Sequence, residues 1–362
     1  RPFAALRPAT GRAADIIAPP YDVLSSDEAR ARVAGRPWSF LHISKPEIDL
    51  PAGTDVHAPA VYAKGAANLR AMIDADVLAR EVMPCYYVYR ITMGAHVQTG
   101  IVAAASVADY DTNRIRKHEF TRPDKEDDRV RQIEAVGAHT GPVLLAYPAA
   151  PAVDAMLSRA TEATPDADAT ADDGIRHTLW VIHDAGVQAQ LTAAFDAMPA
   201  LYIADGHHRS AAASRVAAAR RKAGDGPDAN SQRFLAVAFP HHQMRILPYN
   251  RVVRDLGTHT PESFLAALAA DFEITPADRA VEPAQATEFG LHLSGGRWFR
   301  LRLKSGLVPA ADPVARLDVS LLAKHALEPL LGIVDPRRDP RIDFVGGIRG
   351  VAELEKDRKS VV

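Results

Sequence analysis

The sequence predicts a globular protein of the mixed α+β class. Apolar residues make up 47% and charged residues 24% of the 362 residues, and short runs typical of strands alternate with longer helical segments. This composition excludes collagen, coiled coils and global disorder. Since domains usually span about 100–200 residues, the length predicts two domains or one large one.

Seven runs rich in β-branched, aromatic and other apolar residues are predicted as strands in the first part of the chain: 39–43, 85–92, 97–106, 143–147, 178–182, 201–204 and 234–239. Further strands are expected near 290–293 and 298–303, and helices over 59–79, 261–270 and 317–331. Residues 161–174 are acidic and small, so we interpret them as an exposed loop. The pattern restarts after residue 248, which suggests regions 1–255 and 256–362.

Charge, cysteine content and hydropathy limit the partners of the chain. The 43 basic and 45 acidic residues give a net charge of -2, which offers no general attraction to nucleic acid or anionic lipid. Residues 135–153 are uncharged but broken by proline and glycine, so no membrane span is expected. The lone Cys85 excludes CxxC chemistry and is interpreted as a buried, inert thiol. Because the chain opens at Arg1 without a hydrophobic leader, we expect a slightly trimmed cytoplasmic protein.

The most informative stretch is LYIADGHHRSAAASRV, residues 201–216. An apolar strand leads to Asp205 and Gly206, and an alanine-rich helix follows. Glycine permits a sharp turn, and the first helical turn presents unpaired N–H groups with partial positive charge. Together with the guanidinium of Arg209, this turn is suited to phosphate. In the plainer alternative, Asp205 caps the helix and pairs with Arg209 at the surface.

Two adjacent histidines follow the glycine. On a helix the side chains of His207 and His208 diverge by about 100°, so the pair does not easily bind one metal ion. The pair at His241 and His242 has the same spacing. A single one of these histidines can still orient a phosphate or a substrate.

The second candidate stretch is RKHEFTRPDKEDD, residues 116–128. A carboxylate such as Glu119 at the edge of a cleft can take the proton from a hydroxyl, which is the proton transfer that phosphorylation of an alcohol requires. Taken alone, Glu119 is more simply interpreted as a solvated charge. The acidic residues that follow favour the start of a helix, and Arg129 can pair with them or reach a phosphate.

Other polar residues follow apolar segments. Tyr21 can form the wall of a pocket or pack its proline-rich loop into the core. Ser44, Lys45 and Glu47 are weaker candidates for substrate contact. Arg251 can clamp a phosphate or a carboxylate, although an ion pair explains it equally well.

Nine segments in a fixed order carry a family resemblance: APPYDV (18–23), LHISKPE (41–47), KHEFT (117–121), TGPVLLAY (140–147), ADGHHRSAAA (204–213), ILPYNRVVRDL (246–256), LDVSLL (317–322), LEPLLGI (327–333) and FVGG (344–347). They resemble a widespread bacterial family known as a domain of unknown function. That family is similar to archaeal free-serine kinases (SerK-like proteins) of the ParB and sulfiredoxin superfamily. The resemblance covers essentially the whole chain.

The resemblance implies a ParB/sulfiredoxin-like nucleotide-binding core with additional N-terminal and C-terminal α/β elements. It implies ATP or ADP and Mg²⁺ as cofactors and free L-serine as substrate. Glu119 is then the general base, assisted by Asp205 and His208, and Asp205 holds Mg²⁺ or orients the hydroxyl. The phosphate contacts fall on Gly206, His207, His208, Arg209 and Ser210, and substrate contacts on His118 and Arg251.

The sequence departs from these relatives in three ways. More chain separates the His-Glu element from DGHHR than in the archaeal kinases. His207 stands where sulfiredoxin needs cysteine, which excludes sulfinic-acid repair, and the helix-turn-helix of ParB is absent. The family continues beyond FVGG into a segment that should complete the site, whereas this chain ends at Val362.

The leading hypothesis is therefore a cytoplasmic kinase that converts free L-serine to O-phosphoserine, without nucleic-acid or membrane partners and with homodimerisation left open. The alternative is a non-catalytic nucleotide-binding or regulatory module that keeps the phosphate turn. A histidine-dependent metallohydrolase is a third hypothesis.

Overall fold

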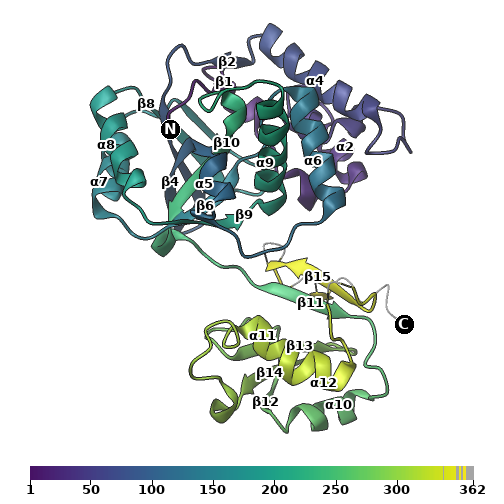
Figure 1. Cartoon of the computed structure of the whole chain (residues 1–362). Coiled ribbons are helices and arrows are strands. Elements are labelled where there is room, and N and C mark those ends of the chain that lie inside the picture. The colour runs from purple at the N-terminus through teal and green to yellow at the C-terminus, as the bar shows by residue number, and fades with distance from the viewer. Residues whose placement is uncertain (337, 348–349, 352–353, 356–362) are drawn as a thin grey trace. The chain divides into compact units, whose positions relative to one another are not determined.

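The computed structural model describes residues 1–336, 338–347, 350–351 and 354–355. Helices and strands alternate along the chain (Figure 1), which confirms the mixed α+β class. The chain divides into two compact units, Arg1–Met244 and Arg245–Val362. This division precedes strand β11 (Tyr249–Val253), whereas the predicted boundary near residue 255 follows that strand.

The first unit is built on a mixed eight-stranded sheet. In spatial order its strands are β5 (Ile115–Arg116), β9 (Leu201–Asp205), β6 (Val143–Tyr147), β10 (Arg233–Pro240), β4 (His96–Ser106), β3 (Tyr86–Met93), β8 (Arg176–Ile182) and β7 (Ala167–Thr170). The pairs β5–β9 and β6–β10 are parallel, and the other neighbours are antiparallel. Alternate residues of these strands form the main core, as expected for a sheet with one face covered by helices.

Helices α5 (Val107–Asp111), α7 (Pro151–Ala160), α8 (Ala185–Asp196) and α9 (His207–Lys222) pack their apolar residues against this core. Helix α9 also contacts α6 (Pro123–Val136), which in turn contacts α4 (Pro59–Asp74) (Figure 1). The rest of the unit consists of the β1–β2 pair and short helical segments: β1 (Leu6–Pro8), β2 (Leu78–Arg80), α1 (Ala13–Ile16), α2 (Ser26–Val33), α3 (Leu41–Ser44), and 3₁₀ turns at Tyr21–Val23, Pro46–Asp49, Asn230–Gln232 and His241–Gln243.

The second unit has its own core around Phe264, Phe272 and Leu321. A three-stranded antiparallel sheet orders β12 (Phe272–Ala277), β14 (Arg297–Leu303) and β13 (Glu288–Leu293), and β11 pairs with β15 (Ile342–Gly346). The helical elements are α10 (Pro261–Leu268), a 3₁₀ turn at Ser305–Leu307, α11 (Asp318–Leu322), a π-helical segment (Ala323–Leu327) and α12 (Glu328–Leu331).

Most predicted elements are confirmed within a few residues, but three differ. The run 39–43 is not a strand: Leu41–Ser44 is helical, with bonds from the Ser44 and Lys45 N–H groups to the Phe40 and Leu41 carbonyls, and the carbonyls of His42 and Ile43 accept from the Asn68 and Gln132 side chains. The loop predicted over 161–174 contains edge strand β7, whose alternate residue Ala169 is buried. The helix predicted over 59–79 ends at Asp74, before Asp76 takes a positive φ of 52°.

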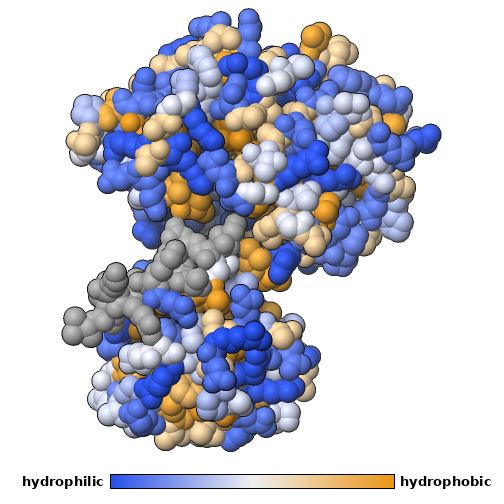
Figure 2. Space-filling model, turned by 180° about the vertical axis from the view of Figure 1, so that it is seen from behind, coloured by the Kyte–Doolittle hydropathy of each residue, from blue (hydrophilic) through white to orange (hydrophobic). Residues whose placement is uncertain are grey.

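Within the described residues, the structure contains no helix that is long and apolar enough to cross a membrane. On the face shown in Figure 2, hydrophilic residues surround separate apolar patches.

Gly100 tests the close packing between strands β4 and β10. A Cβ atom at this position would lie 2.4 Å from the Ala238 carbonyl oxygen and 2.7 Å from the Phe239 ring. We expect Gly100→Ala to destabilise the first unit by about 1–3 kcal/mol, because backbone must move to admit the methyl group. Gly226→Ala is the control, since its Cβ would meet no atom within 4 Å. Denaturant unfolding of both variants measures the effect, and equal stabilities would contradict this packing.

Candidate functional site

The turn between β9 and α9 depends on Gly206. This residue takes the left-handed conformation, with φ 95° and ψ 29°, and forms the N-cap of α9. A Cβ atom there would lie 3.0 Å from Arg209 Nε. A glycine is therefore needed both for the backbone conformation and for the close approach of the Arg209 side chain.

The beginning of α9 presents backbone donors. The first intrahelical bond runs from the Ser210 N–H to the Gly206 carbonyl (3.0 Å). The N–H groups of His207, His208 and Arg209 come before this bond and have no acceptor within the helix. They carry the partial positive charge of the helix N-terminus, as the sequence predicts.

His207 connects this turn to the loop that carries Glu119. Its Nδ1 lies 3.2 Å from Glu119 Oε2, and its Nε2 accepts from the His118 N–H (3.5 Å). The His118 ring packs edge-on against it, with centroids 4.4 Å apart. Because Nε2 is the acceptor, Nδ1 carries the proton of the neutral ring, on the side that faces the Glu119 carboxylate.

His208 holds the same loop at a second point. Its Nε2 accepts from the Arg122 N–H at 3.1 Å. The two histidines diverge around the helix, yet each binds a backbone N–H of the segment from His118 to Arg122. We call this pair of contacts the histidine clasp. It keeps the loop against the start of α9.

The His207 ring favours the neutral form. Burial lowers its pKa, and the neighbouring His118 lowers it further, against the opposing charges of Glu119 and Asp205. The His207 side chain is only 3% exposed, whereas that of Glu119 is 57% exposed. A buried neutral imidazole, His207, thus lies beside the Glu119 carboxylate, which is open to a ligand.

Arg209 lies on the other side of the turn. Its guanidinium donates to Asp205 Oδ2 and to the Pro142 carbonyl. The ion pair is the one anticipated by the plainer interpretation, but Asp205 makes no side-chain capping bond, because Gly206 is the N-cap. The Asp205 side chain is 67% exposed, so this pair contributes little to stability and can be exchanged for another anion.

Ser210 and Arg251 are the remaining predicted contacts. Ser210, expected at the cofactor, is completely buried, and its hydroxyl donates back to the His207 carbonyl at 3.0 Å. Arg251 belongs to β11 of the second unit, where its guanidinium lies over the rings of Tyr249 (5.4 Å) and Phe344 (5.6 Å). Its predicted contact with substrate remains a prediction.

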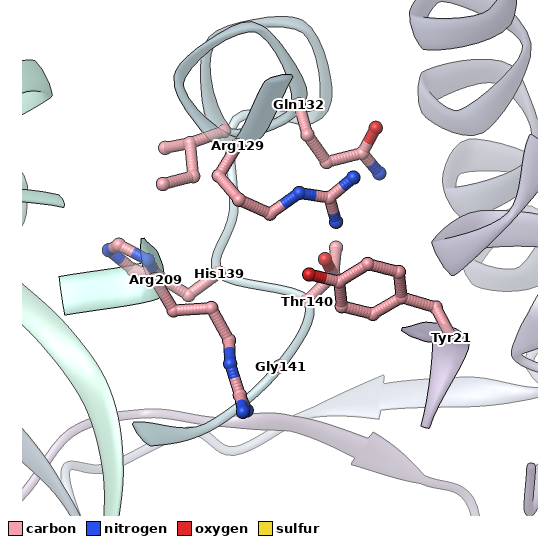
Figure 3. A pocket seen from close by; sticks show the side chains of 8 residues that line it. Tyr21, Arg129, Gln132, His139, Thr140, Gly141 and Arg209 are labelled. Atoms are coloured by element: carbon pink, nitrogen blue, oxygen red, sulfur yellow. The ribbon is translucent and has the colours of Figure 1, made fainter. Parts of the chain in front are cut away.

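Sequence analysis did not identify the small pocket beside Arg209. It is lined by residues from the APPYDV turn, α6, the loop before β6 and α9: Tyr21, Arg129, Gln132, Ile133, His139, Thr140, Gly141 and Arg209 (Figure 3). Tyr21 is half-buried and forms a wall of this pocket, which is the first of the two roles considered for it. The Gly-Pro step at 141–142 is the sequence feature that could have indicated this pocket, because it brings the loop before β6 close to Arg209.

Among the described residues, one group of three side chains could hold a metal ion: Glu81, Cys85 and His183. Burial raises the pKa of the Cys85 thiol, and Glu81 raises it further, consistent with an unreactive thiol. This group does not include Asp205 or the clasp histidines. A metal at the turn would therefore need ligands from a bound phosphate.

A family model described as a protein of unknown function (DUF1015) matches residues 1–320. The chain belongs to the DUF1015 family. The matched region includes all of the first unit and thus the whole DGHHR turn, the clasp and the pocket of this DUF1015 protein. Neither the curated proteins nor the solved structures searched contained a match.

The histidine clasp predicts a pH-dependent contribution to stability. His207→Ala removes the hydrogen bond from the His118 N–H, the contact with Glu119 and a buried ring, so near pH 8 it should destabilise the protein by about 1–3 kcal/mol. Because the folded-state pKa of His207 is lowered from 6.5, the unfolded chain binds more protons as pH falls. The contribution is full above the unfolded pKa and is lost as pH falls towards the folded pKa.

The difference between parent and variant should accordingly narrow at about pH 5.5. Urea unfolding at both pH values measures it. Parallel stability curves for the two proteins would contradict a neutral, buried His207.

Proposed function

We propose that this protein is a small-molecule kinase that transfers a phosphoryl group from ATP or ADP to the hydroxyl of free L-serine, giving O-phosphoserine. The observation that supports this most is the 3.2 Å contact between Glu119 and His207. It joins a carboxylate to the start of α9, and the corresponding two elements of the resembled serine kinases serve as base and phosphate site. A ParB/sulfiredoxin-like relationship and a cytoplasmic location are parts of the same proposal.

In this reaction the serine Oγ attacks the terminal phosphorus of the nucleotide. The new Oγ–P bond forms while the bond to the leaving phosphate oxygen breaks, and the hydroxyl proton passes to Glu119. His207 is a positioning residue: its Nδ1 lies 3.2 Å from one carboxylate oxygen and leaves the other for the proton. His208 keeps the loop in place through Arg122.

Charge on the transferring phosphate is balanced by the chain itself. The N–H groups of His207, His208 and Arg209 point out of the start of α9. The Arg209 guanidinium can leave the exposed Asp205 and form charge-assisted bonds to phosphate oxygens. Little else is required of a phosphoryl-transfer site than such alignment and charge stabilisation.

Asp205 fits the role of a Mg²⁺ ligand. Its carboxylate is mostly exposed, and Mg²⁺ in nucleotide sites commonly takes one or two carboxylates, with phosphates and water completing the shell. When bound, Mg²⁺ would neutralise phosphate charge. Once Arg209 turns to the phosphate, Asp205 is left free for this contact.

The direct test is incubation of the protein with ATP or ADP, Mg²⁺ and a panel of amino acids, with O-phosphoserine detected by mass spectrometry. We expect serine to be phosphorylated. Nucleotide binding without any phosphorylated amino acid would remove the kinase proposal and favour a nucleotide-binding regulatory module.

A base at Glu119 predicts a specific kinetic defect. Glu119→Gln should lower kcat about 10²–10⁴-fold, because general-base catalysis typically supplies that factor. The amide oxygen can still accept from His207, so the thermal unfolding curve should not change. Glu134→Gln, an exposed acid on α6, is the control. Unchanged turnover in Glu119→Gln would show that another group takes the proton.

A further inference from the structure

The pocket beside Arg209 brings together segments that are far apart in the sequence. Tyr21, Arg129, Thr140 and Arg209 come from four different segments and line it together. Figure 3 shows Arg129 and Tyr21 next to each other, whereas the Arg209 side chain runs beside Gly141. Two of these segments, APPYDV and TGPVLLAY, have no role in the function proposed above.

The two charged side chains of the lining are arginines, and each is ion-paired with a carboxylate outside the lining, Arg129 with Asp128 and Arg209 with Asp205. The lining itself contains no acidic residue. The only histidine, His139, has a pKa lowered by burial, so it adds no charge near neutral pH. The side chains of Arg129 and Arg209 are only 12% and 22% exposed. The guanidinium N–H groups that Asp128 and Asp205 leave unused favour an anionic ligand.

Several donors of the pocket are available. Arg129 uses Nε and Nη2 for Asp128, and its Nη1 has no hydrogen-bond partner among the described residues. The Tyr21 hydroxyl likewise makes no hydrogen bond to any residue that the structure describes. Burial raises the pKa of Tyr21, so its hydroxyl stays protonated and can donate. The Tyr21 ring also fixes the guanidinium, which lies 4.2 Å from the ring centroid.

The size of the pocket limits the ligand. Its water-accessible space is about 30 Å³, about two to three times what a single buried water requires. It therefore admits phosphate oxygens but no nucleoside base. The contact of Arg209 with the exposed Asp205 is weak enough to open as an anion enters.

We propose that this pocket binds the non-transferred phosphate groups of the donor nucleotide. The inference rests on the proposed function, because Arg209 belongs both to the turn that would hold the transferring phosphate and to the pocket. Arg129 donates through Nη1, and the Tyr21 hydroxyl donates beside it. The phosphate chain thus extends from the start of α9 towards α6, and the nucleoside remains outside.

The test measures binding without requiring turnover. Isothermal titration calorimetry with inorganic tripolyphosphate and with ATP compares the parent protein with Arg129→Gln, Arg129→Lys and Tyr21→Phe. Loss of a charge-assisted bond should weaken both ligands about tenfold or more in Arg129→Gln. Arg129→Lys should recover part of this loss, and Tyr21→Phe should show a smaller one. Arg220→Gln, on the exposed last turn of α9, removes the same charge and should have no effect.

Wild-type affinity for both ligands in Arg129→Gln would overturn the inference, as would no binding of tripolyphosphate by the parent. If Arg129→Gln fails to fold, Arg129→Lys and Tyr21→Phe decide, and unchanged affinity in both has the same consequence. The outcome is separable from the kinase proposal. Binding that depends on Arg129 without phosphoserine formation would retain the pocket and remove the kinase. Phosphoserine formation by the parent, with unchanged ligand affinities in Arg129→Gln, would retain the kinase proposal and remove the proposed phosphate pocket.

Discussion

Hydrogen bonds from the 118–122 backbone to two adjacent histidines determine the arrangement of the candidate site. His207 and His208 lie on the first turn of α9 and accept from the N–H groups of His118 and Arg122. Strand β5, the packing of α6 on α9 and the contact of Lys117 with the Tyr110 ring anchor the same segment on either side of these bonds. The divergence of the two rings, which makes them poor ligands for one metal ion, lets them bind the loop at two separated points.

The fold gives this clasp a rigid base. Strand β9 lies inside the eight-stranded sheet between β5 and β6, and the pairing of Asp205 with Leu144 of β6 fixes the position of the adjacent Gly206. Helix α9 buries its alanines in the main core, and small side chains allow the helix to lie close to the sheet. Glu119, Asp205 and Arg209 sit on this base with part of their surface open. Rigid support below exposed polar groups is typical of sites that bind or transform small ligands.

Local sequence chemistry was sufficient to predict the strand, the glycine turn and the helix at 201–216, because each residue there favours the same structure. The proximity of Glu119 to this turn was implied by the family resemblance alone. No local rule relates residues that lie so far apart along the sequence, although β5 and β9 are neighbours in the sheet. The bond between His208 and Arg122 and the pocket between Tyr21 and Arg129 could not be predicted, because they depend on how α6 packs against α9. The false strand at 39–43 has a similar cause. A short apolar run is compatible with a strand or a buried helix. The observed helix packs against distant segments that contribute Asn68 and Gln132 as donors to its carbonyls, and these contacts are not visible in the local sequence.

The central claim is that the start of α9 grips a phosphate while Glu119 faces the acceptor hydroxyl. A crystal structure of the protein with ADP and Mg²⁺ tests it most directly. The claim requires the terminal phosphate to lie against the N–H groups of residues 207–209, with the Arg209 side chain turned away from Asp205 towards it. A nucleotide bound elsewhere, with this turn unchanged and the ion pair between Asp205 and Arg209 intact, would contradict it.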